Sequence, residues 1–286
     1  MADHAHNLRA SAAAGRPFGV ITRGTTNHNR LRRCDRWMLA HPEISTLLRH
    51  VEKPLALDVG YGASHATTVE WAGWLRRANP QVDVRGLEIH PDRVLPPRDG
   101  VRFELGGFEL AGYRPQLVRA FNVLRQYDVD QVQEAWQTVC SRLAPGGFFV
   151  EGTCDELGRR AAWLLLDARG PRTLTLAWDP FDVARPSDIA ERLPKILIHR
   201  NVPGEPIHEL LKAADEAWDH AAGWAPYGPR VRWRMARAAL ADAPPSPSTL
   251  KNYEIGRTKV KKIIRRWGVM GMLVAVTFAY RPHYHR

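Results

Sequence analysis

The fold is decided by residues 55–68, which read LALDVGYGASHATT. The apolar run 55–59 predicts a short buried strand, and a helix running toward Leu75 is expected after the glycines. Gly60 and Gly62 let the chain turn sharply and let a ligand approach the backbone, because neither residue has a Cβ. The N–H groups at the start of the helix point back at the same place. The stretch therefore predicts a nucleotide-binding loop in a parallel α/β sheet.

Two classes of cofactor use such a loop. Dinucleotide sites need G-x-G-x-x-G, and this chain has His65 at the position of the third glycine. What it carries instead is Asp58-x-Gly60-x-Gly62-x-Ser64. This pattern resembles motif I of the class I S-adenosylmethionine (SAM)-dependent methyltransferases, in which a third glycine commonly stands where this chain has Ser64.

Further apolar runs continue the alternation of strands and helices. We expect strands at 82–89, 101–105, 116–121 and from 148 onward, and helices at 67–78 and 129–143. The runs 161–167 and 172–178 predict a hairpin, and helical spacing returns after residue 186. The resemblance implies an α/β fold: a Rossmann-like, mostly parallel, seven-stranded sheet with an antiparallel edge hairpin and a C-terminal helical extension.

The resemblance also implies which residues contact SAM. Glu88 stands at the tip of the second strand, where Rossmann-type proteins hold ribose hydroxyls with a carboxylate. Gly107 occupies the place after the third strand where these methyltransferases usually carry an acidic residue that contacts adenine. From the methionine end of SAM toward the methyl group and the adenine, the implied contacts are Asp58, Gly60, Gly62, Asn122, Glu88, Gly107 and Phe108.

The residues that carry out catalysis are less evident. Methyl transfer needs alignment of donor and acceptor, and a base where the acceptor holds a proton. Tyr127, Cys154 and Asp155 follow the fourth and fifth strands and are candidates. Thr153-Cys154 resembles the nucleophile pair of RNA cytosine-5 methyltransferases, but Asn122 begins the place where those enzymes have Pro-Cys. A thiolate also needs a lowered pKa, so an ordinary small thiol at a strand end is the simpler reading.

Composition and the resemblance together predict four parts. We expect a disordered N-terminus at 1–21 and a helical extension at 181–242, followed by a linker and a basic, apolar tail at 243–286. The resemblance implies that 22–180 form a SAM-binding methyltransferase domain with a leading basic helix. Asn29 is the expected cap of the leading helix.

The net charge of +11 belongs to the two ends of the chain. Residues 1–36 hold seven Arg and two acidic residues, and residues 251–286 hold nine Lys or Arg and one Glu, so the middle is close to neutral. Basic ends can contact phosphate, which makes nucleic acid a possible partner beside a small-molecule acceptor. The apolar run at 269–280 is shorter than a membrane span, and we do not expect a membrane partner.

Three scattered cysteines fit neither a disulfide framework nor a zinc site, and the histidines have no metal-ligand spacing. No signal sequence is visible, so we expect a cytoplasmic protein without a metal. The first functional hypothesis is a SAM-dependent methyltransferase acting on RNA or a small molecule. An NAD(P)-binding Rossmann oxidoreductase and a non-catalytic SAM-fold module that binds nucleic acid stay open as alternatives.

Overall fold

The computed structural model describes residues 17–19, 26–242 and 275–279. The expected proline-rich linker and the basic run at 259–266, and most of the expected unordered residues 1–21, lie outside the described residues. The chain forms two compact units. The first contains residues 1–158 and 165–170, and the second contains residues 159–164 and 171–286.

The first unit is built on a parallel sheet. Its strands are β1 (Leu55–Val59), β2 (Asp83–Glu88), β3 (Arg102–Leu105), β4 (Leu117–Phe121) and β5 (Phe148–Cys154). β1 pairs with both β2 and β4, so the order β3-β2-β1-β4-β5 reverses direction at β1. In such a doubly wound sheet, the carboxyl ends of the strands at the reversal are where ligands bind.

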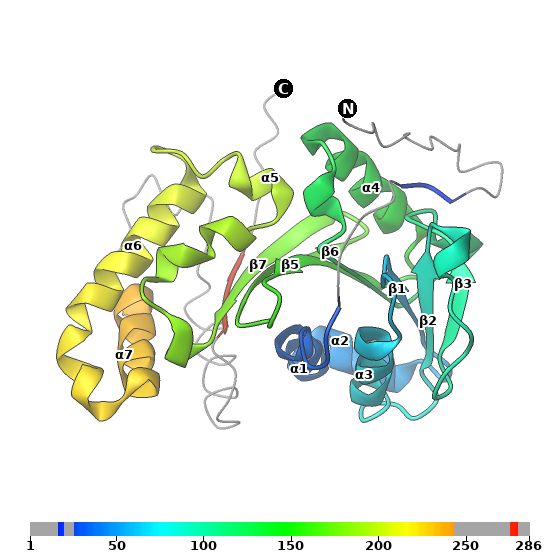
Figure 1. Cartoon of the computed structure of the whole chain (residues 1–286), viewed down its shortest axis with the longest axis horizontal. Helices are drawn as coiled ribbons and strands as arrows, with labels where there is room; N and C mark the ends of the chain where they lie inside the picture. Colours follow the sequence, from blue (N-terminus) through cyan, green and yellow to red (C-terminus); the bar gives the residue numbers. More distant parts are fainter. Residues whose placement is uncertain (1–16, 20–25, 243–274, 280–286) are drawn as a thin grey trace. The chain divides into compact units, whose positions relative to one another are not determined.

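Helices cover both faces of this sheet (Figure 1). α1 (Arg32–Ala40), α2 (Pro42–His50) and α3 (Ala66–Leu75) lie on one face, and α4 (Val129–Arg142) lies on the other. α4 is held at its start by Asp128, whose N–H donates to the Gln131 side chain in a capping box. Apolar side chains on one side of each helix are buried against the strands, which is the source of most of the stability of such helices.

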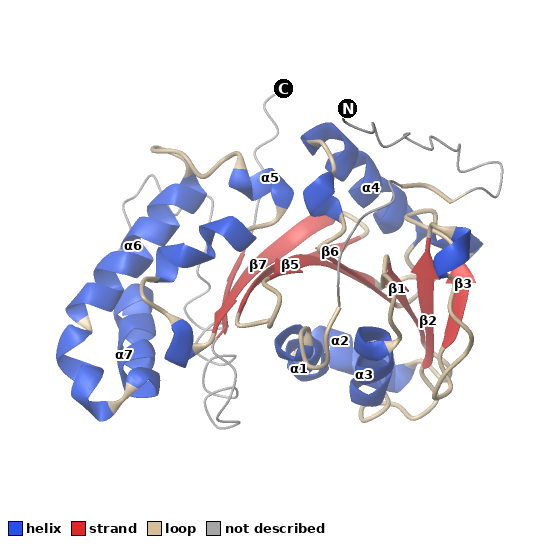
Figure 2. Ribbon diagram, viewed as in Figure 1, coloured by secondary structure: helices blue, strands red, loops and turns tan. Residues whose placement is uncertain are grey.

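The second unit is mainly helical (Figure 2). It contains α5 (Lys195–Ile198), α6 (Pro206–His220) and α7 (Pro229–Asp242), together with most of β7 (Gly170–Trp178) and all of β8 (Ala275–Ala279). α6 packs against α7, and the rings of Trp218 and Trp233 lie 5.7 Å apart between them. β8 runs antiparallel to β7.

β6 (Arg160–Asp167) precedes β7, and the strand order within the described part of the chain is β3-β2-β1-β4-β5-β6-β7-β8. The expected Rossmann-like α/β fold, with its mostly parallel sheet, hairpin and helical extension, is confirmed. One detail differs: β8 pairs with β7, so the sheet has an eighth strand and β7 is not its edge. An apolar run late in the chain supplies that strand.

One local expectation was wrong. Asn29 does not cap the leading helix: its φ is 62°, its N–H donates to Glu70, and α1 begins only at Arg32. The sequence analysis also did not predict α2. No helix within the described residues is long and apolar enough to cross a membrane.

Candidate functional site

The glycine turn after β1 has the sharp, left-handed backbone that its paired glycines predict. Gly60 and Gly62 have φ values of 70° and 81°, a region that glycine enters without steric cost. A Cβ on Gly60 would lie 2.6 Å from Val123, so the chain after β4 packs directly on the turn. Tyr61, between the glycines, is buried, and its hydroxyl donates to the Arg93 carbonyl at 3.0 Å. The turn is therefore fixed on both sides.

Glu88 lies beside this turn. One of its carboxylate oxygens accepts from the Gly62 N–H at 3.3 Å, and the other accepts from Ile89 and His90 at 3.0 and 3.2 Å. All three donors are backbone groups. A carboxylate has about four lone-pair positions, so Glu88 can accept a further hydrogen bond. The structure thus brings Gly60, Gly62 and Glu88 together at the carboxyl ends of β1 and β2.

The loop after β3 holds Gly107, Phe108 and a third residue that we did not predict. Glu109 turns its carboxylate back over the loop, where Oε1 accepts from the Gly107 N–H at 2.7 Å. A carboxylate therefore lies at the tip of β3 after all, supplied from two positions further along. Phe108 is buried, and its ring meets the ring of Tyr127 edge-on at 5.8 Å. Phe18 lies against this loop, because the Phe108 N–H donates to the Phe18 carbonyl at 2.9 Å.

Asp58 has a different environment. Its oxygens accept from Arg119 at 2.9 and 2.5 Å and from the Thr68 hydroxyl at 2.7 Å. Arg119, on β4, also donates to Asp35 of α1 at 2.5 Å, and its guanidinium lies 4.4 Å from the Trp71 ring centre. The whole cluster is buried. Asp58 thus faces the helix layer beneath the turn.

The charges of this cluster depend on each other. Burial raises the pKa of Asp35 to about 7, and Arg119 opposes that rise. Burial would lower the pKa of Arg119, but Asp58 and Asp35 hold it above its ordinary value. A buried guanidinium between two carboxylates keeps each partner from being left unpaired, which is the costly state for a buried charge.

The candidates for catalysis lie around the ends of β4 and β5. Asn122 accepts from the Cys154 N–H at 2.9 Å and donates to its sulfur at 3.3 Å. Cys154 is buried and burial raises the pKa of its thiol, which is the reverse of what a nucleophilic thiolate needs. The Asp155 carbonyl accepts from Arg30 at 2.9 Å, and Tyr127 is buried against Phe108.

Another carboxylate escaped the sequence analysis. Glu151 lies in the middle of β5, is fully buried, and neither of its oxygens has a hydrogen-bond partner among the described residues. Burial raises its pKa to about 8. Glu151 and Arg119 could have been found in the sequence by the same feature. Each is the one charged residue of its strand. Such a residue has to find a partner or lose its charge.

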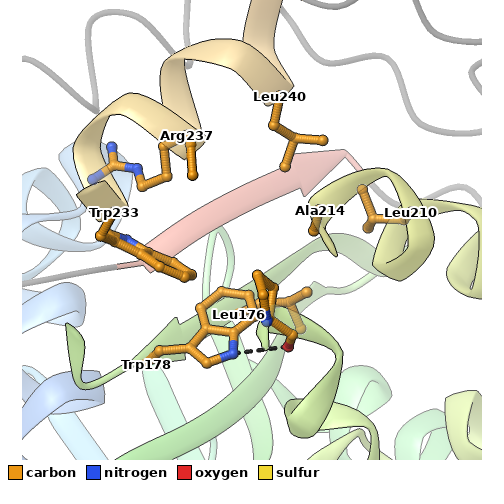
Figure 3. A pocket seen from close by; sticks show the side chains of 9 residues that line it. Leu176, Trp178, Leu210, Ala214, Trp233, Arg237 and Leu240 are labelled. Atoms are coloured by element: carbon orange, nitrogen blue, oxygen red, sulfur yellow. Dashed lines mark hydrogen bonds between the residues drawn. The ribbon is translucent and has the colours of Figure 1, made fainter. Parts of the chain in front are cut away.

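The second unit contains a pocket of its own (Figure 3). Side chains of β7, α6 and α7 line it, among them Leu176, Leu210 and Trp233, and the Trp178 indole donates to the Pro186 carbonyl at 2.9 Å. Its lining is apolar apart from Arg237, whose pKa burial lowers to about 10. No group of three or more metal-ligating side chains occurs within the described residues.

No protein-family model matches this chain, and no curated protein matches it. Among solved structures it is similar to a mitomycin 7-O-methyltransferase, with 17% identity over 41% of this chain and 42% of that one and a TM-score of 0.29. It is similar to magnesium protoporphyrin IX methyltransferase from Synechocystis with bound SAM, with 15% identity, 46% and 67% coverage and a TM-score of 0.30. Human N-acetylserotonin methyltransferase with SAM gives 19% identity, 46% and 40% coverage and a TM-score of 0.29. With likenesses this distant, only contacts within this chain bear on its function.

Proposed function

We propose that this protein is a SAM-dependent methyltransferase of the class I superfamily, with its cofactor site in the first unit. One observation carries the proposal: the Glu88 carboxylate lies beside the Gly62 N–H, where β1 and β2 end next to the reversal of strand order. A ribose diol is held by a hydrogen-bond acceptor in a fixed position. That acceptor must lie close to a backbone turn, so that the groups attached to the ribose can pack against the turn. Glu88 and the two glycines have that arrangement.

The residues around the turn fit the parts of SAM. The positive φ values of Gly60 and Gly62 form the sharp turn that the methionine part would approach. Glu88 accepts from a ribose hydroxyl with a lone pair that its backbone donors leave free. Bound SAM would supply a sulfonium-activated methyl group for in-line transfer. The task of the protein is then alignment, since such a displacement needs little covalent help. Asp58 does not contact the cofactor in this proposal. It fixes β1, which ends at the turn, to β4 through its hydrogen bonds with Arg119.

The acceptor is RNA or a small molecule, and it would approach the ends of β4 and β5. Asn122, Tyr127 and Asp155 supply polar groups there. Cys154 contributes as a buried thiol bonded to Asn122, so we do not route transfer through a covalent cysteine adduct. Basic ends favour RNA as acceptor through phosphate contacts.

Two other functions make different predictions. An NAD(P)-dependent oxidoreductase would use the same turn, but His65 takes the place of the third glycine, and its ring packs at 4.9 Å against Phe103. A non-catalytic module would bind nucleic acid with strong salt dependence and transfer no methyl group. Titrations with SAM, SAH and NADPH distinguish the proposed methyltransferase from an oxidoreductase. Methyl-label transfer distinguishes it from a non-catalytic module.

The experiment is calorimetric titration of the full chain with SAH and with NADPH. We expect SAH to bind and Glu88→Ala to weaken it by more than tenfold, because the ribose loses its acceptor. Glu104→Ala is the matched control: Glu104 lies on β3, pairs with Arg85 at 3.0 Å, and is not at the turn. Its affinity should equal that of the wild type. Absence of SAH binding in the wild type, or equal loss in both variants, would disprove the proposal.

Methyl-label transfer then identifies the acceptor. Full-length protein and tritiated SAM are incubated with the RNA, protein and small-molecule fractions of a cell extract. Label in the RNA fraction that ribonuclease removes would identify RNA as acceptor, and label in the small-molecule fraction would identify the other class. Glu88→Ala serves as the inactive control.

A further inference from the structure

Residues 17–19 lie across the loop that follows β3. Both main-chain polar groups of Phe18 bond to this loop: its N–H donates to Glu109 Oε2, and its carbonyl accepts from the Phe108 N–H at 2.9 Å. The two bonds come from one residue and end on neighbouring groups. The first unit therefore holds part of its own N-terminal segment through a carboxylate next to an N–H.

Glycines make this contact close. A Cβ on Gly107 would lie 2.2 Å from the Phe18 carbonyl oxygen, so the two backbones touch only because Gly107 has no side chain. A Cβ on Gly19 would lie 2.7 Å from the Tyr127 hydroxyl and 3.3 Å from Ile89 Cδ1. Residues 17–19 thus fill the space between side chains that follow β2, β3 and β4.

The loop offers an acceptor beside a donor. Glu109 Oε2 accepts and the Phe108 N–H donates, so the pair suits any group that carries a donor next to an acceptor. The Watson–Crick edge of adenine has this arrangement, since the exocyclic amino group donates and the adjacent ring nitrogen accepts. The main chain of Phe18 has it too, which is why the two can compete for the same place.

We propose that, in the free protein, the main chain of Phe18 occupies the place that the resemblance implies for adenine, where Glu109 and the Phe108 N–H offer an acceptor beside a donor. This inference rests on the proposed function. Binding of the nucleoside then has to displace residues 17–19. The affinity that is measured is reduced by the fraction of molecules in which Phe18 is in place.

The first test compares two full-length variants by calorimetric titration with SAH. Phe18→Pro removes the N–H that Glu109 accepts, because proline has no such donor. Phe18→Ala keeps that N–H and controls for loss of the ring. We expect Phe18→Pro to bind SAH about tenfold more tightly than Phe18→Ala, the effect of one hydrogen bond to a charged group. Equal or weaker binding by Phe18→Pro would overturn the competition while leaving SAH binding intact.

The second test uses hydrogen exchange in the wild-type chain. We expect SAH to speed exchange of the Phe18 amide and to leave the Phe108 amide protected, since a new acceptor replaces the Phe18 carbonyl. A Phe18 amide that stays protected in the SAH complex would also overturn the competition. If neither the wild type nor Phe18→Pro binds SAH, the proposed function fails, and this inference fails with it.

Discussion

Asp58 and Glu88 end adjacent strands, and both were predicted to contact the cofactor. Their burial is the same, at 3% and 4% exposure, so burial does not distinguish them. Their partners do. Asp58 is bonded to the Arg119 guanidinium and the Thr68 hydroxyl, whereas Glu88, among the described residues, accepts only from backbone N–H groups.

This difference separates a structural carboxylate from one that can serve a ligand. If Asp58 turned away from Arg119 to contact a ligand, the Arg119 guanidinium would lose one of its buried partners. A ligand contact at Asp58 would therefore weaken the fold. Backbone donors belong to the turn itself and stay in place whether or not a ligand is bound. Glu88 can therefore add a hydrogen bond without giving one up.

The largest effect is expected when the pairing of Asp58 is broken. Arg119→Met keeps most of the side-chain volume but leaves Asp58 and Asp35 buried without their cation. We expect the free energy of unfolding to fall by about 3–5 kcal/mol in urea denaturation. Arg85→Met is the control, because Arg85 forms ion pairs with Asp83 and Glu104 that are partly exposed to water. A loss of about 1 kcal/mol is expected there, and equal losses would contradict the comparison.

Glu151 indicates what a buried carboxylate does without any partner. Its folded pKa of about 8 lies above the value of 4.5 that it has when unfolded, so the folded chain holds its proton more tightly. The stability of the wild type should therefore fall as the pH rises from about 5 to 8, by up to about 1.4 kcal/mol for each pH unit. Glu151→Gln should lose this slope, so its stability relative to the wild type should rise by up to about 4 kcal/mol between pH 5 and pH 8. Parallel pH profiles in thermal or urea unfolding would show that Glu151 is paired.

Replacing each carboxylate by its amide should affect SAH binding differently at Glu88 and at Asp58. Glu88→Gln should weaken SAH binding by about tenfold, near 1.4 kcal/mol. It should also lower stability by about 1 kcal/mol, because the amide has one acceptor oxygen where the carboxylate uses two. Asp58→Asn should lower stability and change the affinity of the folded protein less than twofold, because its oxygens face Arg119. Titration below the unfolding transition measures both variants. A tenfold loss of affinity in Asp58→Asn would return Asp58 to the cofactor contacts.

The smallest effect concerns Thr68, the second partner of Asp58. Thr68→Val removes one hydroxyl donor at similar volume, and the bond it breaks is 2.7 Å long. We expect a loss of about 1 kcal/mol in urea unfolding, since Arg119 still holds the carboxylate. SAH affinity should be unchanged. A loss as large as that of Arg119→Met would mean that the hydroxyl, and not the guanidinium, fixes Asp58.

The residue pattern alone predicts the sheet of the first unit and the turn that ends β1. Apolar runs and paired glycines report local geometry, and the nearness of Gly62 to Glu88 follows once β1 and β2 are parallel neighbours. The contacts of each charged side chain become known only from how the elements pack. Asp58 meets Arg119 from a strand 61 positions away, and Glu109 meets Phe18 across 91 positions. The spacing of residues along the chain does not predict such pairs. Two distant side chains come within bonding distance only after the strands and helices have packed.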